Sequence, residues 1–148
     1  PPVLLPLPAA ALRQEFDLEL DTDKPYLNFQ GRINAHRDEL AALLRKLKGE
    51  GRKIHVYGAS TKGNTILQWC GIDARIISVA AERNPDKYAA RTLGTDIPIV
   101  SEEESRAMKP DYYLVLPWHF REEFLQREVD TRRSGIKFIF PLPRIEIL

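Results

Sequence analysis

Lys53-Ile54-His55-Val56-Tyr57-Gly58-Ala59-Ser60-Thr61-Lys62-Gly63-Asn64-Thr65 is the stretch that decides the fold. Residues 54–57 favour a strand, and the polar loop that follows opens a helix. Gly58 permits a sharp turn, whereas Gly63 removes a Cβ where the new helix must lie close to a strand. Backbone N–H groups at the helix start would face the space beyond the strand. The stretch therefore predicts an anion site there.

The composition limits the class of protein. The chain has 148 residues, of which 43% are hydrophobic and 29% charged, as expected for one soluble globular domain. Its net charge of +1 favours neither nucleic acid nor a membrane surface as a partner. The single cysteine, Cys70, excludes an internal disulfide, and without CxxC or HExxH spacing we expect no metal site. A cytoplasmic location fits this cysteine usage.

The first 25 residues differ from the rest. Four prolines within residues 1–8 predict an extended connection, as in a linker cut between two domains. Residues 15–20 alternate polar and apolar, which suits a short edge strand or isolated extended packing. We therefore expect residues 1–25 to be a linker or edge segment and residues 26–148 to be the folded domain.

Within the domain, predicted helices and strands alternate. Apolar residues spaced by three and four from Tyr26 onward predict a long amphipathic helix ending near Gly49 and Gly51. Ser101 and Glu104 form a predicted capping box at the start of an acidic helix. The predicted strands are residues 54–57, 75–80, 97–100, 111–116 and 137–140, with a last short strand possible within 144–148.

This alternation predicts a three-layer, Rossmann-like α/β domain with a doubly wound, mainly parallel sheet. Parallel crossovers are right-handed in about 98% of cases, so we expect the core strand order 3-2-1-4-5. In that order the loops after the first and fourth strands border one crevice at the switch point.

The loop after the first strand resembles two nucleotide motifs without matching either. It has the first and last glycines of G-x-G-x-x-G, but Ser60 takes the middle position, which argues against NAD or FAD. Lys62 precedes the second glycine, so the loop is not a P-loop. We predict phosphate binding by the loop, with Lys62 as its mobile charge; the alternative is that Ser60 or Thr61 only caps the helix. The predicted loop residues are Gly58, Ser60, Thr61, Lys62, Gly63, Asn64 and Thr65.

Three further residues follow strands at the same predicted edge. Glu82 stands where a Rossmann-type acid would meet a ribose hydroxyl, although a solvated loop is the favoured interpretation. Trp118 could stack on a base or sugar, and His119 could bond a phosphate or a hydroxyl. Equally, Trp118 could cover the end of the sheet and His119 could cap the next helix.

The remaining conspicuous side chains are expected to be structural. His36 lies on the apolar stripe of the long helix, and His55 lies inside a strand. Cys70 is expected to be a small core residue, because the sequence places no basic partner near it. The spacing of Trp69 also predicts a core position.

Four segments, residues 56–65, 81–87, 94–103 and 110–120, occur in the order of one known family. Through them, residues 29–148 resemble the C-terminal domain of S-adenosylmethionine-dependent C-methyltransferases, including those that methylate nucleotide-activated deoxysugars. Members of the family combine a zinc-binding module, a central methyltransferase domain and a Rossmann-like C-terminal domain that helps enclose the nucleotide-sugar.

The resemblance implies a substrate-side role. The sequence contains neither four cysteines for zinc nor an Asp/Glu-x-Gly-x-Gly-type cofactor loop, so we expect no cofactor here, and S-adenosylmethionine and zinc in the full-length enzyme. No catalytic residue can be carried over. The domain would position a nucleotide-sugar while a missing central domain of the same chain transfers methyl to a deprotonated sugar carbon. Two alternatives remain open: a stand-alone nucleotide- or NAD(P)-binding Rossmann domain, and a purely structural domain.

Overall fold

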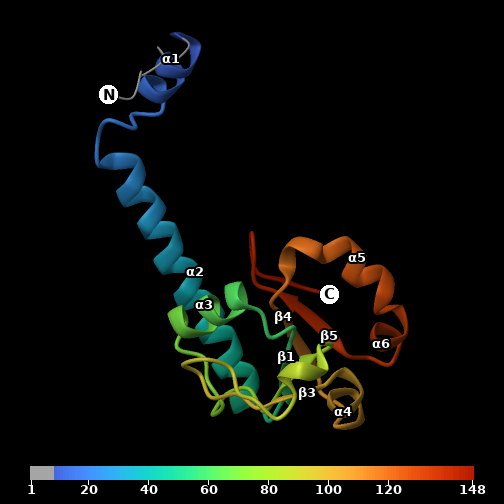
Figure 1. The fold of residues 1–148 in the computed structure, drawn as a ribbon. Helices are drawn as coiled ribbons and strands as arrows, with labels where there is room; N and C mark the ends of the chain where they lie inside the picture. The colour runs from blue at the N-terminus through green and yellow to red at the C-terminus, as the bar shows by residue number, and fades with distance from the viewer. Residues whose placement is uncertain (1–8) are drawn as a thin grey trace. The chain divides into compact units, whose positions relative to one another are not determined.

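The computed structural model describes residues 9–148 as an α/β fold (Figure 1). The linker predicted for residues 1–8 lies outside the described residues. The helices are α1 (Ala9–Asp17), α2 (Lys24–Gly49), α3 (Thr61–Trp69), α4 (Glu102–Ala107), α5 (Arg121–Arg127) and α6 (Val129–Arg133), with 3-10 turns η1 (Pro85–Lys87) and η2 (Trp118–Phe120). The strands are β1 (Ile54–Tyr57), β2 (Ala80–Glu82), β3 (Ile99–Ser101), β4 (Tyr112–Val115), β5 (Lys137–Phe140) and β6 (Glu146–Ile147).

The sheet confirms the predicted topology. Its order is β3-β2-β1-β4-β5-β6, and the first five strands run parallel. Val56 of β1 lies opposite Ala80 on one side and Leu114 on the other. The short β6 adds an antiparallel edge to β5, as the last short strand in the sequence suggested. The switch point lies between β1 and β4, where the connections leave the sheet in opposite directions.

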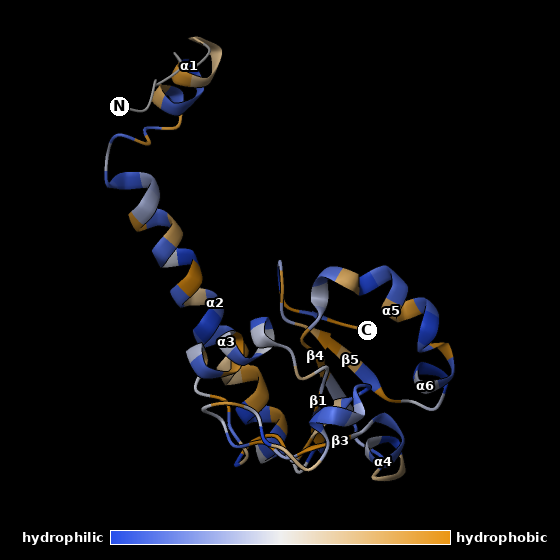
Figure 2. Cartoon of the chain, viewed as in Figure 1, coloured by the Kyte–Doolittle hydropathy of each residue, from blue (hydrophilic) through white to orange (hydrophobic). Residues whose placement is uncertain are grey.

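Helices cover both faces of the sheet, and the two faces have different chemistry. One face packs aliphatic side chains of β1, β4 and β5 against Leu40 and Leu44 of α2 and Leu67 of α3. We call it the aliphatic face. In Figure 2, β4 and β5 are largely coloured as hydrophobic, as expected for strands buried on both faces.

The opposite face is rich in aromatic rings, and we call it the aromatic face. Tyr57, Tyr113 and Phe138 project there and pack with Phe124 of α5. The Tyr57 and Phe124 rings meet edge-on with centroids 4.6 Å apart. Aromatic pairs favour this arrangement. Because side chains alternate along a strand, neighbouring residues such as Val56 and Tyr57 belong to different faces.

The described chain divides into two compact units, and the division falls within α2, after Ala35. In the first unit, Tyr26 donates a hydrogen bond to the Leu20 carbonyl and Lys24 pairs with Glu19. The second unit, His36–Leu148, contains the whole sheet. Among residues 9–148, no helix has the length and apolar character to cross a membrane.

The prediction of an edge strand or extended segment over residues 15–20 is wrong. Helix α1 continues to Asp17, and the Leu18 N–H still donates to the Gln14 carbonyl in a helical bond of 3.0 Å. The run of helix-forming residues from Ala9 to Gln14 explains this outcome, since the alternating stretch is short and follows it directly. Local helix propensity therefore prevailed over a weak two-residue period.

The strand predicted for residues 75–80 begins later than expected, since β2 covers only Ala80–Glu82. The Asp73 carboxylate accepts from the Arg75 backbone N–H at 2.9 Å, and the Asp73 carbonyl accepts from Ile76 and Ile77. An aspartate that bonds the backbone just ahead of it stabilises a turn in competition with a ladder. The turn covers residues 74–76, and the buried Ile77 and Val79 follow it outside any strand.

Trp69 is not the core residue that its spacing predicted. It is 49% exposed, and the guanidinium of Arg37 lies 5.3 Å from its ring centroid. Trp69 is the last residue of α3, where the helical stripe turns out of the core, while Cys70 is buried as predicted. An exposed tryptophan can gain stability from a cation over its ring instead of from burial.

Candidate functional site

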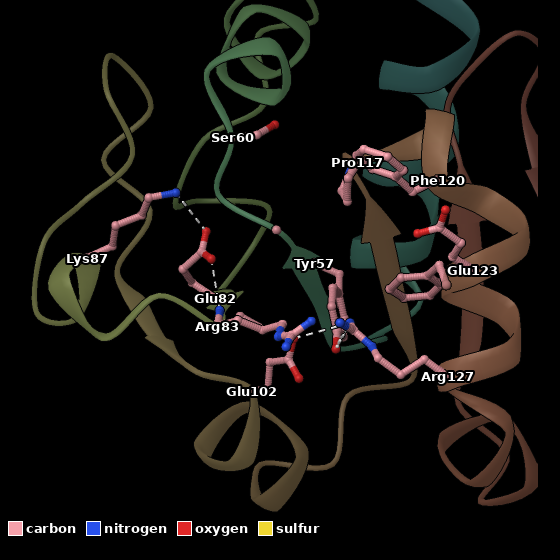
Figure 3. A pocket seen from close by; sticks show the side chains of 13 residues that line it. Tyr57, Ser60, Glu82, Arg83, Lys87, Glu102, Pro117, Phe120, Glu123 and Arg127 are labelled. Carbon is pink, nitrogen blue, oxygen red and sulfur yellow. Dashed lines mark hydrogen bonds and ion pairs between the residues drawn. The ribbon is translucent and has the colours of Figure 1, made fainter.

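A pocket of about 430 Å³ opens at the carboxyl ends of the parallel strands. It falls at the switch point between β1 and β4, where open α/β sheets bind ligands. Figure 3 shows two groups of side chains, with Ser60, Glu82, Arg83 and Lys87 on one side and Pro117, Phe120, Glu123 and Arg127 on the other. The lining residues are Tyr57, Gly58, Ser60, Ala81, Glu82, Arg83, Lys87, Glu102, Pro117, Phe120, Glu123, Phe124 and Arg127.

The turn after β1 brings the exits of β1 and β4 together, as the sequence predicted. Gly58 has a φ of +84°, and a Cβ there would lie 2.8 Å from Cδ of Pro117, so both backbone conformation and space require glycine. A Cβ at Gly63 would lie 2.5 Å from Cδ1 of Leu116. This confirms the expectation that Gly63 lets α3 approach a strand closely.

Ser60 caps helix α3. Its hydroxyl accepts from the Gly63 N–H at 3.0 Å, which is the capping contact that the sequence suggested. The Gly58 and Ala59 N–H groups are also used within the protein, by the Ala81 carbonyl and the Glu82 carboxylate. Most of the loop backbone is therefore occupied by the fold itself.

Glu82 organises the loops around it. Its side chain is 13% exposed and accepts from the backbone N–H groups of Ala59, Arg83 and Asn84, and it pairs with Lys87 at 3.1 Å. Burial alone would raise the pKa of Glu82, but these hydrogen bonds and the Lys87 charge outweigh it and lower the pKa. Both carboxylate oxygens of Glu82 are therefore engaged within the protein.

A partly buried ionic network, centred on the buried Glu128, lies beneath the pocket on the aromatic face. The Tyr57 hydroxyl donates to Glu128 at 2.8 Å and accepts from Arg127 at 2.7 Å. Arg106 donates to the same hydroxyl and to Glu128, whose side chain is only 3% exposed. Glu102 pairs with both arginines and completes the network.

The network favours ionised carboxylates and a neutral tyrosine. Burial would raise the pKa of Glu128, yet hydrogen bonds from Thr131 and Tyr57 and the Arg106 charge hold it below its usual value. Burial, with the nearby Glu102 and Glu128 carboxylates, raises the pKa of Tyr57. Tyr57 is therefore a fixed structural hydroxyl and a poor proton donor or acceptor near neutral pH.

The structure places three of the predicted site residues on the pocket lining and seven elsewhere. Gly58, Ser60 and Glu82 line the pocket. The lining does not include Thr61, Lys62, Gly63, Asn64, Thr65, Trp118 or His119. The binding roles suggested for these ten residues stay predictions.

Sequence reasoning missed the lining residues on the far wall. Phe120, Glu123, Phe124 and Arg127 project into the pocket from η2 and α5. Their spacing of three, four and seven residues marks one face of a helix, a signal that could have identified them. Arg83 follows β2 directly and was overlooked beside Glu82.

The site has the character of a binding pocket. The lining has three carboxylates and three cations, and among residues 9–148 no cluster of three or more metal-binding side chains occurs. The lining contains no cysteine and no histidine. Volume, aromatic walls and separate charged groups are typical of small-molecule sites.

Fold and pocket together define a Rossmann-like α/β domain with an open crevice at its switch point. Residues 8–143 match the family described as the C-methyltransferase C-terminal domain, and the chain therefore belongs to that family. Over 143 residues it is 29% identical to the "C-methyltransferase NovU" of Streptomyces niveus. The match covers 97% of this chain and 34% of that relative, so the chain spans about a third of the relative's length. The resemblance noted in the sequence is confirmed.

Proposed function

We propose that this domain binds the nucleotide diphosphate part of an activated sugar and positions the sugar for C-methylation in an S-adenosylmethionine-dependent enzyme. One observation carries the proposal: the pocket of about 430 Å³ lies at the switch point of a C-methyltransferase C-terminal domain. That position is where parallel α/β sheets present ligands, and the volume suits a nucleoside diphosphate.

The proposed role is positional. Two lining residues that could otherwise exchange a proton are engaged within the protein, since Tyr57 is held by Glu128 and Arg127 and Glu82 is bonded to three N–H groups. The base and the methyl donor would belong to a central domain of the same chain, as the family suggests. Holding the diphosphate fixes the reactive carbon, and such orientation contributes several kcal/mol to catalysis, roughly 7 or more in the most favourable cases.

Exposed apolar side chains in the first unit support the idea of a partner domain. Phe16 is 74% exposed, Leu27 63% and Phe29 55%, although large apolar groups normally gain from burial. The relative from Streptomyces niveus is about three times as long as the matched region. We propose that a preceding domain of the parent enzyme covers these side chains.

The rival nucleotide function, NAD(P) binding, is less well supported. Ser60 replaces the middle glycine and its hydroxyl is used as a helix cap, while the Glu82 carboxylate is bonded internally. A dinucleotide site needs close backbone approach and a free acid for the ribose. The proposal therefore favours a mononucleotide diphosphate.

Calorimetric titration of the chain with a nucleoside diphosphate, S-adenosylmethionine and NADH tests the proposal. We expect saturable binding of the nucleoside diphosphate, no binding of S-adenosylmethionine at millimolar concentration, and no methyl transfer. Micromolar affinity for S-adenosylmethionine or NADH would contradict the assignment, as would failure of the nucleoside diphosphate to bind.

A further inference from the structure

The three cations that line the pocket differ in whether a carboxylate pairs with them. Lys87 pairs with Glu82 at 3.1 Å, and Arg127 pairs with Glu102 at 3.3 Å and with Glu128 at 3.0 Å. Arg83 is the third lining cation, and among residues 9–148 no carboxylate pairs with its guanidinium. Arg83 is therefore the lining cation with its donors available to a ligand.

The position of Arg83 is held by the fold, whereas its side chain is exposed. Its backbone N–H donates to Glu82 at 2.9 Å, and its carbonyl accepts from the Tyr88 hydroxyl at 3.3 Å. A guanidinium presents a planar fork that matches two phosphate oxygens, so Arg83 suits a phosphate group better than a lysine would.

An exposed ring stands on the opposite wall. Phe120 is 52% exposed and lines the pocket from η2, directly after β4. Strands β2 and β4 flank β1, so their exits lie roughly 10 Å apart, two strand spacings. That separation suits a nucleoside diphosphate with its phosphates at β2 and its base at β4, and an exposed aromatic face is a stacking platform for any base.

Resting on the proposed function, we infer that the pocket binds its nucleotide in two parts, with Arg83 on the diphosphate and Phe120 stacked on the base. This assignment moves the main phosphate contact from Lys62 to Arg83. Lys62 is exposed and is not part of the pocket lining. The Glu82 bonds that fix the Arg83 backbone make this lining cation a defined part of the site.

Two variants and two matched comparisons test the inference. Arg83→Ala is compared with Lys62→Ala, an exposed cation outside the lining, and Phe120→Ala with His119→Ala, the exposed ring beside it. Each protein is titrated with a nucleoside diphosphate, the nucleoside alone and inorganic pyrophosphate. Circular dichroism checks that each variant is folded.

We expect Arg83→Ala to lower the affinity for the nucleoside diphosphate and for pyrophosphate by about tenfold or more. Its affinity for the nucleoside alone should not change. Phe120→Ala should lower the affinity for the nucleoside diphosphate and for the nucleoside by about fivefold or more. Its affinity for pyrophosphate should not change. Lys62→Ala and His119→Ala should change each affinity less than about twofold. Added salt should weaken wild-type binding more than that of Arg83→Ala.

Several outcomes would overturn the inference while leaving the proposed function intact. One is that Lys62→Ala, and not Arg83→Ala, lowers the affinity for the nucleoside diphosphate. Another is that Arg83→Ala lowers the affinities for the nucleoside and for pyrophosphate equally, which would indicate a change of pocket shape. If the wild-type chain binds none of the three ligands, the proposed function fails first, and the inference fails with it.

Discussion

The two faces of the sheet come from the same strands yet are stabilised in different ways. On the aliphatic face, Val56 and Leu114 pack in one hydrophobic cluster with Leu40 and Leu44 of α2 and Leu67 of α3. On the aromatic face, Tyr57 and Tyr113 pack beside charged and polar groups that are equally buried, including Glu128. The pocket opens over the second face, since Tyr57 and Phe124 belong to both.

The difference teaches how one fold separates stability from function. Aliphatic packing depends on volume and involves no charge that salt could screen or a proton could neutralise. A buried ionic network contributes little net stability compared with an apolar core, but removal of one member leaves the others uncompensated. The network holds Arg127 and Glu102 at the pocket wall through their ion pairs, so the charge of that wall is largely balanced within the protein.

Among the substitutions on the aromatic face, removal of Glu128 should lower the stability of the protein most. Glu128→Ala leaves Arg106, Arg127 and the Tyr57 hydroxyl without their shared buried acceptor, and we expect a loss of about 3–5 kcal/mol in the free energy of unfolding. Urea denaturation measures it. Leu44→Ala on the aliphatic face should cost about 2–5 kcal/mol.

Salt distinguishes these two losses. The cost of Glu128→Ala should change between low and high salt because exposed parts of the network are screened, whereas the cost of Leu44→Ala should not. Glu128→Gln keeps the side-chain volume but removes the charge. It should therefore lower the free energy of unfolding by most of the amount expected for Glu128→Ala. A stability within about 1 kcal/mol of wild type for Glu128→Ala would contradict the distinction between the faces.

The aromatic face should also make stability depend on pH through His55. This side chain is 1% exposed and bonded to Ser105 at 2.8 Å; burial, assisted by the Lys53 charge, lowers its pKa from 6.5 to about 4. Between pH 6.5 and 4 the unfolded chain binds a proton that the folded protein does not. Stability is therefore full above pH 6.5 and falls by about 3 kcal/mol as the pH drops to 4.

His55→Gln tests this dependence, because glutamine can still bond Ser105 and does not titrate. Urea denaturation at pH 6.5 and pH 4.5 should show a smaller decrease for the variant than for wild type. Below pH 4.5 the carboxylates Glu82 and Glu128, whose pKa values are lowered, add their own losses as they are protonated. An identical decrease in both proteins between pH 6.5 and 4.5 would show that His55 is not the source.

Much of the fold could be predicted because its signals are local. The apolar runs at β1, β4 and β5 and the capping box at Ser101 were recognised within a residue or two. The start of β2 was not, since the turn depends on Asp73 bonding to Arg75 and its neighbours, a competition that hydrophobicity does not report. Trp69 was misplaced for a related reason, because its contact with Arg37 comes from another helix.

The candidate site was harder to predict than the fold. The β1 loop marked the correct end of the sheet, but its polar groups are largely consumed by capping and by Glu82. The walls of the pocket come from four separate connections that only the strand order brings together. Which cation remains unpaired there depends on three-dimensional partners, so Arg83 could not be distinguished from Lys62 in the sequence.

The smallest expected effect tests packing on the aliphatic face. A Cβ on Gly63 would lie 2.7 Å from Cβ of Leu116, an atom that rotamer changes cannot move, so Gly63→Ala must shift α3 away from β4. Overpacking costs roughly 1–3 kcal/mol, against about 1 kcal/mol gained in helix propensity. We expect a net loss of about 1 kcal/mol, unaffected by salt or pH.

Gly49→Ala is the matched comparison, because Gly49 is also helical and belongs to the same unit, but nothing lies within 4 Å of an added Cβ. Only the propensity gain remains there, so this variant should be more stable than wild type by up to about 1 kcal/mol. Urea denaturation followed by far-UV circular dichroism measures both. The opposite signs are the test: if both substitutions stabilise the protein, α3 and β4 can separate without cost, and close packing does not define the aliphatic face.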